Sequence, residues 1–236
     1  MLKPNQIKGV VFDFDGTLVD SDPIHYSVWT LLLKRLGRNF TKEDFAEFAG
    51  KQVSFIADYI IKKYKLKITK EELIREKREI TLDYFRKKPP KFMPYAKEAL
   101  VFFSRRGFKL GLATGNLKEV VISILKKGGL NDFFSVIVDG WDVARGKPYP
   151  DTYLLAAQKL GLEPRRCLAI EDTQYGVESA KAAGFYAFAV PSGISSLQDF
   201  SKADKVFSDL KELILKIQKD GLADLKLELS PKIEIE

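Results

Sequence analysis

Two carboxylates stand two residues apart in the segment Asp13-Phe14-Asp15-Gly16-Thr17-Leu18, directly after an apolar run at residues 7–12. A buried strand that ends there would place both side chains at its carboxyl end, where open α/β sheets bind their ligands. Like charges this close repel each other unless a cation lies nearby or one group takes up a proton. The pair therefore predicts a metal site, a nucleophile with an acid–base partner, or both. The alternative is a polar turn at the Asp15-Gly16 step.

Two further polar clusters follow apolar runs in the same way. Thr114-Gly115-Asn116 comes after residues 108–113 and combines a hydroxyl, a glycine that admits a close backbone approach and the start of an expected helix. Such a start can bind an anion, although the same triplet is also an ordinary helix cap. Glu171-Asp172-Thr173 comes after residues 167–170 and supplies a second pair of acids. The sequence thus places acids and anion-binding groups at the ends of several strands.

A fourth cluster is the loop at residues 145–151, which holds Lys147. Pro148 and Pro150 stiffen the backbone after the lysine, which fixes where its ammonium points. We expect Asp151 to be the N-cap of the helix that follows. A single lysine in a loop is usually solvated, so Lys147 gains significance only beside the other clusters.

The elements that must position these clusters alternate along the chain. Apolar runs typical of buried strands occupy residues 7–12, 108–113, 134–138, 167–170 and 185–190. Helical spacing is found at residues 94–106, 117–127, 151–160 and 173–183, the last ended by Gly184. Strands that alternate with helices predict an α/β fold with a doubly wound parallel sheet. A short strand near residues 205–207 and a helix at 208–218 would complete it, and the tail at 222–236 is left unassigned.

In a parallel sheet the carboxyl ends of neighbouring strands meet at one edge. The polar residues of the four clusters therefore converge on one crevice. They are Asp13, Asp15, Thr114, Lys147, Glu171 and Asp172. Acids beside a lysine, a hydroxyl and backbone amides suit Mg²⁺ together with a phosphate, because Mg²⁺ takes one or two carboxylates, several waters and phosphate oxygens.

The first strand and the second are separated by about 70 residues more than a βαβ crossover needs. This insert carries amphipathic helical segments at 24–36, 42–48, 52–64 and 70–87. Thr41 and Thr69 are N-cap candidates, because acidic residues follow each of them. We predict a core formed by residues 1–18 and 93–236 and a helical cap domain at residues 19–92 that lies over the carboxylates. Hinges are expected near residues 19–22 and 91–95.

Composition bounds the class of protein. The chain has 236 residues, 45% of them hydrophobic, and 39 Lys and Arg against 32 Asp and Glu. The basic excess is spread over helical faces without an aromatic–basic module, which favours a solvated surface over a nucleic-acid groove. Cys167 is the only cysteine, so no intramolecular disulfide can form. Neither a signal peptide nor a membrane span is expected. We expect a cytoplasmic protein without a membrane partner, as a monomer or a homodimer.

With its four clusters in this order, the chain resembles the haloacid dehalogenase superfamily, in the branch of helical-cap phosphatases and β-phosphoglucomutase-like enzymes. The resemblance covers residues 6–210, nearly the whole chain. It implies a Rossmann-like core, Mg²⁺ as cofactor and a small phosphorylated metabolite as partner. The implied reaction is hydrolysis of a small phosphomonoester, such as a sugar phosphate or phosphoglycolate, through an aspartyl-phosphate.

The resemblance also implies roles for single residues. Asp13 would be the nucleophile, and Asp15 the general acid for the leaving alcohol and then the general base for water. Lys147 would bridge the nucleophile and the phosphate, which would also be bound by Thr114, Gly115 and Asn116. The implied metal ligands are Asp13, the Asp15 carbonyl and Asp172, with Glu171 as a further ligand or a partner of one.

Substrate choice would fall to the cap. The chain is similar to the β-phosphoglucomutase-like group around residues 20–25 and 49–52, which makes His25 and Lys51 candidate substrate-binding residues. His25 could equally be a core residue, or a hinge residue that aligns Asp15. The mutases carry an arginine three positions after the cap glycine, where this chain has Val53. Hydrolysis is therefore favoured, and a phosphomutase is the alternative.

Two other functions are less favoured. Displacement of a halide needs no proton donor, so an acid at Asp15 argues against dehalogenase chemistry. A non-catalytic binding protein on the same fold is the remaining alternative, and the filled catalytic positions argue against it.

Overall fold

The computed structural model of the chain describes residues 7–47, 51 and 53–224. Within this part the centre is a six-stranded sheet of order β5-β4-β1-β6-β7-β8, and all its neighbouring strands are parallel. Its strands are β1 (Gly9–Phe12), β4 (Lys109–Ala113), β5 (Val136–Val138), β6 (Cys167–Glu171), β7 (Tyr186–Ala189) and β8 (Lys205–Val206). The predicted parallel sheet is confirmed.

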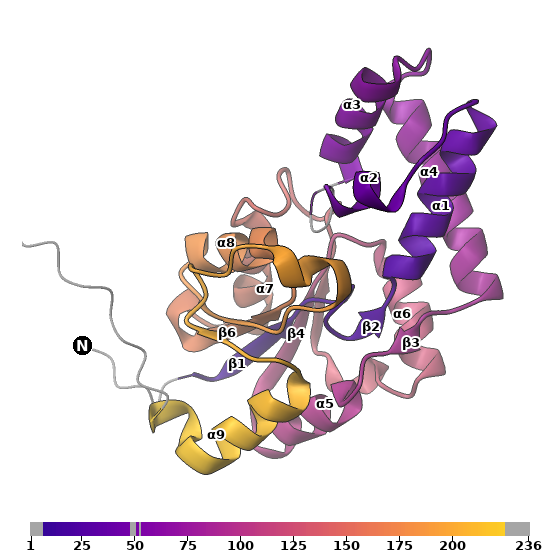
Figure 1. The fold of residues 1–236 in the computed structure, drawn as a ribbon. Coiled ribbons are helices and arrows are strands. Elements are labelled where there is room, and N and C mark those ends of the chain that lie inside the picture. The colour runs from indigo at the N-terminus through magenta and orange to yellow at the C-terminus, as the bar shows by residue number, and fades with distance from the viewer. Residues whose placement is uncertain (1–6, 48–50, 52, 225–236) are drawn as a thin grey trace, which may run out of the picture.

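Helices cover both faces of the sheet (Figure 1). On one face lie α5 (Ala96–Arg105), α6 (Lys118–Lys127) and α9 (Leu210–Asp224), and on the other α7 (Asp151–Leu160) and α8 (Gln174–Ala182). Short 3₁₀ helices occur at η2 (Asn131–Phe133), η3 (Pro164–Arg166) and η4 (Gly193–Leu197). No helix in the described part is long and apolar enough to cross a membrane.

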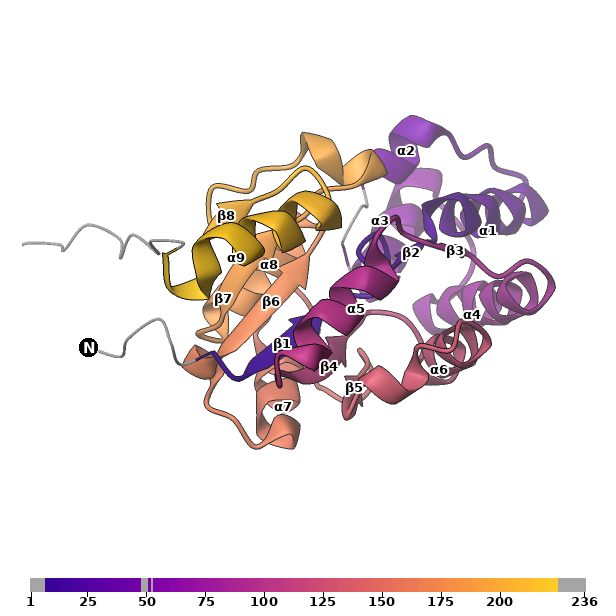
Figure 2. The same ribbon diagram turned by 90° about the horizontal axis from the view of Figure 1, so that it is seen from below.

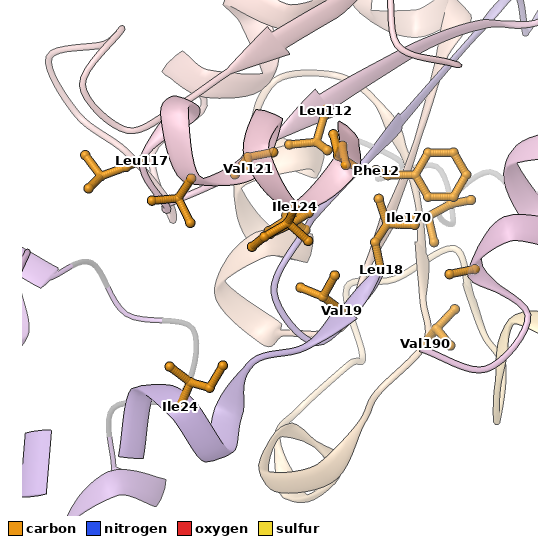
Figure 3. Packing of buried hydrophobic residues seen from close by; sticks show 14 of the residues in the cluster. Phe12, Leu18, Val19, Ile24, Leu112, Leu117, Val121, Ile124, Ile170 and Val190 are labelled. Atoms are coloured by element: carbon orange, nitrogen blue, oxygen red, sulfur yellow. The ribbon is translucent and has the colours of Figure 1, made fainter. Parts of the chain in front are cut away.

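Strand β1 lies in the middle of the sheet and is buried on both sides. Val10 and Phe12 pack in the cluster beneath α5, α6 and α9, whereas Val11 packs in the cluster beneath α7 and α8. This alternation follows from the two-residue period of a strand. Figure 3 shows Phe12 near Leu112 and Ile170, its partners on β4 and β6. The core thus fixes the carboxyl end of β1, and the acids that follow it, at the centre of one sheet edge.

Four helices, called here the helical insert, lie between residues 20 and 91 in the described sequence. They are α1 (Asp22–Arg35), α2 (Lys42–Ala46), α3 (Val53–Tyr64) and α4 (Lys70–Lys87). α1 and α3 each pack against α4, and the insert lies to one side of the sheet (Figure 2). Thr41 and Thr69 each form a capping box, with Asp44 and Glu72 respectively, which confirms both N-cap predictions.

An antiparallel ribbon of two short strands joins the insert to the sheet. β2 (Val19–Asp20) pairs with β3 (Lys91–Phe92), and the Met93 amide donates to the Leu18 carbonyl at 2.8 Å. The sequence did not predict this ribbon, because two residues are too few to show alternation. Both expected hinge segments contain one of its strands. The boundaries at residues 18/19 and 92/93, and the hinges themselves, stay predictions.

Two details differ from the sequence prediction. Asp151 is not an N-cap, because Pro150 before it already has helical dihedral angles and Asp151 is the first residue of α7. Its carboxylate instead pairs with Arg145 at 3.2 Å. The last helix runs beyond residue 218 to Asp224, with a non-helical Gly221 inside it. Of the unassigned tail at 222–236, residues 225–236 lie outside the described residues.

Candidate active site

Lys147 joins the ends of three central strands. Its Nζ lies 2.5 Å from Asp13 Oδ1 after β1 and 3.0 Å from the Ala113 carbonyl at the end of β4. It also donates to Glu171 Oε1 at the end of β6. Burial lowers the pKa of Lys147, but the attraction of Asp13 and Glu171 outweighs it, so its pKa lies above the usual value. The ammonium therefore stays charged between two carboxylates.

Asp13, Glu171 and Asp172 form a buried acidic cluster. Each offers a carboxylate oxygen, and these oxygens all lie within 4.8 Å of one another. Burial raises the pKa of Asp13 and of Asp172, and the neighbouring carboxylates raise both further. In Asp13 the nearby Lys147 offsets only part of this rise. When ionised, the three carboxylates carry more negative charge than the one ammonium balances, and they offer hard oxygen donors. A divalent cation such as Mg²⁺ fits such a set of ligands.

Protein donors engage both oxygens of Glu171. Tyr153 donates its hydroxyl to Oε1 at 2.7 Å, and Thr173 Oγ1 lies 3.3 Å from Oε2. α8 approaches the same carboxylate so closely that a Cβ at Gly176 would collide with it. This arrangement holds Glu171 as a partner of Lys147.

Asp172 lies among hydroxyl groups. Ser195 Oγ is 3.3 Å from Oδ2, and Thr17 Oγ1 approaches Oδ1 at 3.5 Å. Ser192 bonds the Gly16 carbonyl at 2.8 Å, which ties the loop after β7 to the loop after β1. Gly16 has a φ of 84°, and a Cβ there would collide with Asp172. The sequence did not single out Ser192 or Ser195, because no acidic or apolar pattern marks that serine-rich loop.

Asp15 has a different environment from Asp13. Its Oδ1 accepts from Ser21 Oγ at 2.6 Å, lies 3.3 Å from His25 Nε2 and accepts from Asn116 Nδ2 at 3.3 Å. Burial raises the pKa of Asp15, but these hydrogen bonds outweigh it, so its pKa lies below the usual value. Two carboxylates whose pKa values are shifted in opposite directions are typical of a nucleophile or ligand beside an acid–base group.

The loop after β4 is shaped by its own side chains. Thr114 Oγ1 accepts from the Asn116 amide at 2.9 Å, and Asn116 Oδ1 accepts from the Leu117 amide at 2.8 Å before α6 begins. Thr114 and Asn116 are buried, and Gly115 is exposed. The loop therefore presents a hydroxyl and backbone beside Asp15.

One cleft of about 390 Å³, called here the active-site cleft, collects nearly all the predicted site residues. Those that line it are Asp13, Asp15, His25, Lys51, Thr114, Gly115, Asn116, Lys147 and Asp172. Glu171 is not among its lining residues and lies behind Lys147. Lys51 Nζ lies 4.8 Å from the ring centre of Phe55, and its neighbours at 48–50 and 52 lie outside the described residues.

The model of the haloacid dehalogenase-like hydrolases matches residues 7–184 of the chain. The chain belongs to this family. Fructose-1-phosphate phosphatase YqaB of Escherichia coli K12 is 31% identical to this hydrolase over 186 residues, which are 77% of this chain and 95% of YqaB. The β-phosphoglucomutase of Bacillus subtilis 168 is 29% identical over 217 residues, which are 89% of this chain and 93% of the mutase.

A solved structure agrees with this relationship. The crystal structure of CbbY from Rhodobacter sphaeroides in complex with phosphate has a TM-score of 0.80 and 25% sequence identity, and the match covers 88% of this hydrolase and 96% of CbbY. The predicted superfamily and fold are therefore confirmed. The hydrolase is an enzyme that acts on phosphoric monoesters, and its relatives include proteins named as phosphatases and as a β-phosphoglucomutase.

Proposed function

We propose that this hydrolase is a Mg²⁺-dependent phosphatase of small phosphomonoesters that forms an aspartyl-phosphate on Asp13. The observation that carries the proposal is the active-site cleft, where Lys147 touches Asp13 and Asp15 lies on the same surface. Sugar phosphates are the first candidate substrates, because YqaB and other relatives are named for phosphorylated carbohydrates.

In the first step an oxygen of Asp13 attacks the phosphorus and the bond to the alcohol oxygen breaks. Lys147 stabilises the negative charge, and Thr114 with the neighbouring backbone amides holds the phosphoryl oxygens. Asp15 gives its proton to the leaving alcohol. Its carboxylate is ionised in the free cleft, and a phosphate dianion beside it would raise its pKa so that it enters the step protonated.

In the second step water attacks the phosphorus of the aspartyl-phosphate. Asp15, now ionised, takes a proton from the water as the bond between Asp13 and phosphorus breaks. Inorganic phosphate leaves, and Asp13 is restored. One carboxylate thus divides a difficult displacement into two easier ones.

The acidic cluster fits the proposed Mg²⁺. Asp13 and Asp172 would hold the ion together with the Asp15 carbonyl, and Glu171 would be a ligand or a partner of one. When bound, Mg²⁺ neutralises negative charge on phosphoryl oxygens.

We further propose that the helical insert is a cap domain that closes over bound substrate. The active-site cleft is lined from both sides, by Trp29 and Lys77 of the insert and by residues of the strand ends. Arg78 of α4 also pairs with Glu119 of α6 at 3.1 Å, which joins the two parts across the cleft. Such closure would exclude bulk water from the cleft while the aspartyl-phosphate forms.

Removal of the metal tests the proposed cofactor. With excess chelator, release of phosphate from a panel of sugar phosphates should fall by at least about 100-fold, because the acidic cluster then lacks its counter-ion. Millimolar Mg²⁺ should restore the rate and also raise the melting temperature. Full activity in the chelator would contradict the proposal.

Replacement of His25 tests the role of Asp15. His25→Ala should lower kcat about tenfold, because Asp15 loses a donor that orients it. It should also move the acidic limb of the pH profile upward: without His25 the pKa of Asp15 rises, so its basic form is lost at a higher pH. His25→Gln should restore part of the rate, and Ser27→Ala, on the same helix, is the control. An unshifted limb would assign His25 a purely structural role.

A phosphomutase is the second candidate, because relatives named β-phosphoglucomutase match most of the chain. Val53, which lines the cleft, occupies the position where we expect an arginine in a mutase, and this difference favours the phosphatase. Adding glucose 1-phosphate with glucose 1,6-bisphosphate distinguishes the two: formation of glucose 6-phosphate faster than release of phosphate would favour the mutase.

A further inference from the structure

Trp141 stands at the opening of the active-site cleft and is 51% exposed. It follows β5 by three residues, and within the described residues its indole has no ring or cation contact. An indole is more often largely buried. A flat apolar surface at a cleft opening is suited to stacking on a ligand.

The loop that carries Trp141 is held in place. Asp139, which is buried, accepts from the Trp141 amide at 2.9 Å and from the Asp142 amide at 3.0 Å. Its other oxygen accepts from the Lys118 amide at the start of α6, at 3.0 Å. Asp139 directly follows the apolar run at residues 134–138, so the sequence also places an acid at the end of this strand. These bonds make the indole a pre-positioned surface.

The helical insert provides another wall of the cleft, which is lined by both polar and apolar side chains. Its apolar part, called here the apolar wall, consists of Trp29, Phe45, Val53, Ile56 and Ile74. A polyol pressed against this wall would lose hydrogen bonds to water without gaining as many from the protein. The faces of an aromatic ring form no strong hydrogen bonds to water, so stacking them on this wall removes apolar surface from water at little cost. The wall therefore favours a ring over a hydroxylated chain.

The polar groups of the helical insert that line the cleft include the ammonium of Lys77. Lys77 Nζ lies 6.0 Å from the ring centre of Trp29, and no carboxylate of the described residues lies within 4.0 Å of it. Arg78, by contrast, is paired with Glu119. Burial lowers the pKa of Lys77 to about 8, and the nearby Asp15 offsets only part of that effect. Such a group gains from an anionic or acceptor oxygen on a ligand.

We propose that the preferred substrates carry a flat heteroaromatic ring in the leaving group, stacked on Trp141 and the apolar wall, with an acceptor oxygen that Lys77 binds. The inference rests on the proposed phosphatase function, and it ranks ring-bearing esters ahead of the sugar phosphates that the names of the relatives suggest. A cleft of about 390 Å³ is in the size range of sites for ring-bearing ligands. Phosphorylated pyridine and flavin compounds belong to this class.

Substrate comparison with the full-length enzyme and Mg²⁺ tests the class. Pyridoxine 5′-phosphate, benzyl phosphate and fructose 1-phosphate are all esters of primary alcohols, so their leaving groups are similar in chemistry. We expect kcat/KM for pyridoxine 5′-phosphate to exceed that for fructose 1-phosphate at least about tenfold, with benzyl phosphate between them. Acetyl phosphate serves as a substrate that needs no ring.

Variants then test the residues. Trp141→Ala should lower the ratio of kcat/KM for pyridoxine 5′-phosphate to that for fructose 1-phosphate at least about fivefold, mainly through KM. Trp141→Phe should keep most of the ratio. Tyr149→Ala is the matched control, because Tyr149 belongs to the same connection between β5 and α7, is 49% exposed and stacks on Arg145 without lining the cleft. Lys77→Met should lower the rate on pyridoxine 5′-phosphate more than that on benzyl phosphate.

The outcomes separate the two proposals. Faster turnover of fructose 1-phosphate than of both ring esters, or an unchanged ratio in Trp141→Ala, would overturn the ring proposal and leave the phosphatase intact. Hydrolysis of acetyl phosphate without that of either ring ester would do the same. If neither the three esters nor acetyl phosphate is hydrolysed with Mg²⁺ present, the proposed function fails and the ring proposal with it.

Discussion

Replacing Asp13 with Asn should reduce the release of phosphate by at least about 10³-fold, because an amide oxygen is a poor nucleophile for phosphorus. The substitution keeps the size of the side chain, and Lys147 can still donate to the amide oxygen. The fold should therefore be retained. The measurement is kcat/KM for a sugar phosphate and for acetyl phosphate, together with a circular dichroism spectrum and a melting curve.

The matched control is Asp20→Asn. Asp20 is an exposed acid seven positions further along the chain, and it does not line the active-site cleft. It should keep close to full activity. If Asp13→Asn kept more than a few per cent of the wild-type rate, the aspartyl-phosphate mechanism would be wrong, whatever the cleft binds.

Replacing Lys147 with Met should affect both activity and stability. The variant leaves Asp13 and Glu171 buried without their shared cation, and breaking a buried ion pair in this way costs about 3–5 kcal/mol in free energy of unfolding. Turnover should fall by at least about 10³-fold, because the phosphoryl group loses its fixed positive charge. Urea unfolding and steady-state kinetics, with chelator in the unfolding experiments, measure the two effects.

The pH dependence of this variant has a definite sign. The pKa of Asp13 already lies above its ordinary value, and without the attraction of Lys147 it rises further. A group whose pKa is raised by folding contributes stability at low pH and loses it as pH rises towards the folded-state pKa. The variant should therefore be less destabilised at pH 5 than at pH 8. Lys87→Met, which removes an exposed pair with Asp83, should change little at either pH.

Much of the fold could be predicted because its signals are local. The runs that became β1, β4 and β6 are apolar for several residues, and a polar residue follows each of them directly: Asp13, Thr114 and Asp172. Parallel topology then brought Asp13, Lys147 and Asp172 together from widely separated positions. The helical segments of the insert carried clear spacing and two capping boxes.

What the sequence did not reveal depends on tertiary contacts. Ser195 bonds Asp172, and Tyr153 bonds Glu171, only because separate loops and helices meet at the sheet edge. No spacing rule marks a serine or tyrosine for such a role. Lys77 looked like any charge on a solvated helix face, since the sequence gives no measure of how closely α1 and α4 would enclose it.

The ribbon of β2 and β3 connects the helical insert to the backbone beside Asp15. Its two strands are bonded to one another, so neither connection can twist without the other. Val19, at the start of the ribbon, also forms a β-bridge with Asp15. If the helices rotate about this double connection, as we propose, the motion would pull on the backbone of Asp15 and would align its carboxyl in step with the admission or enclosure of a ligand.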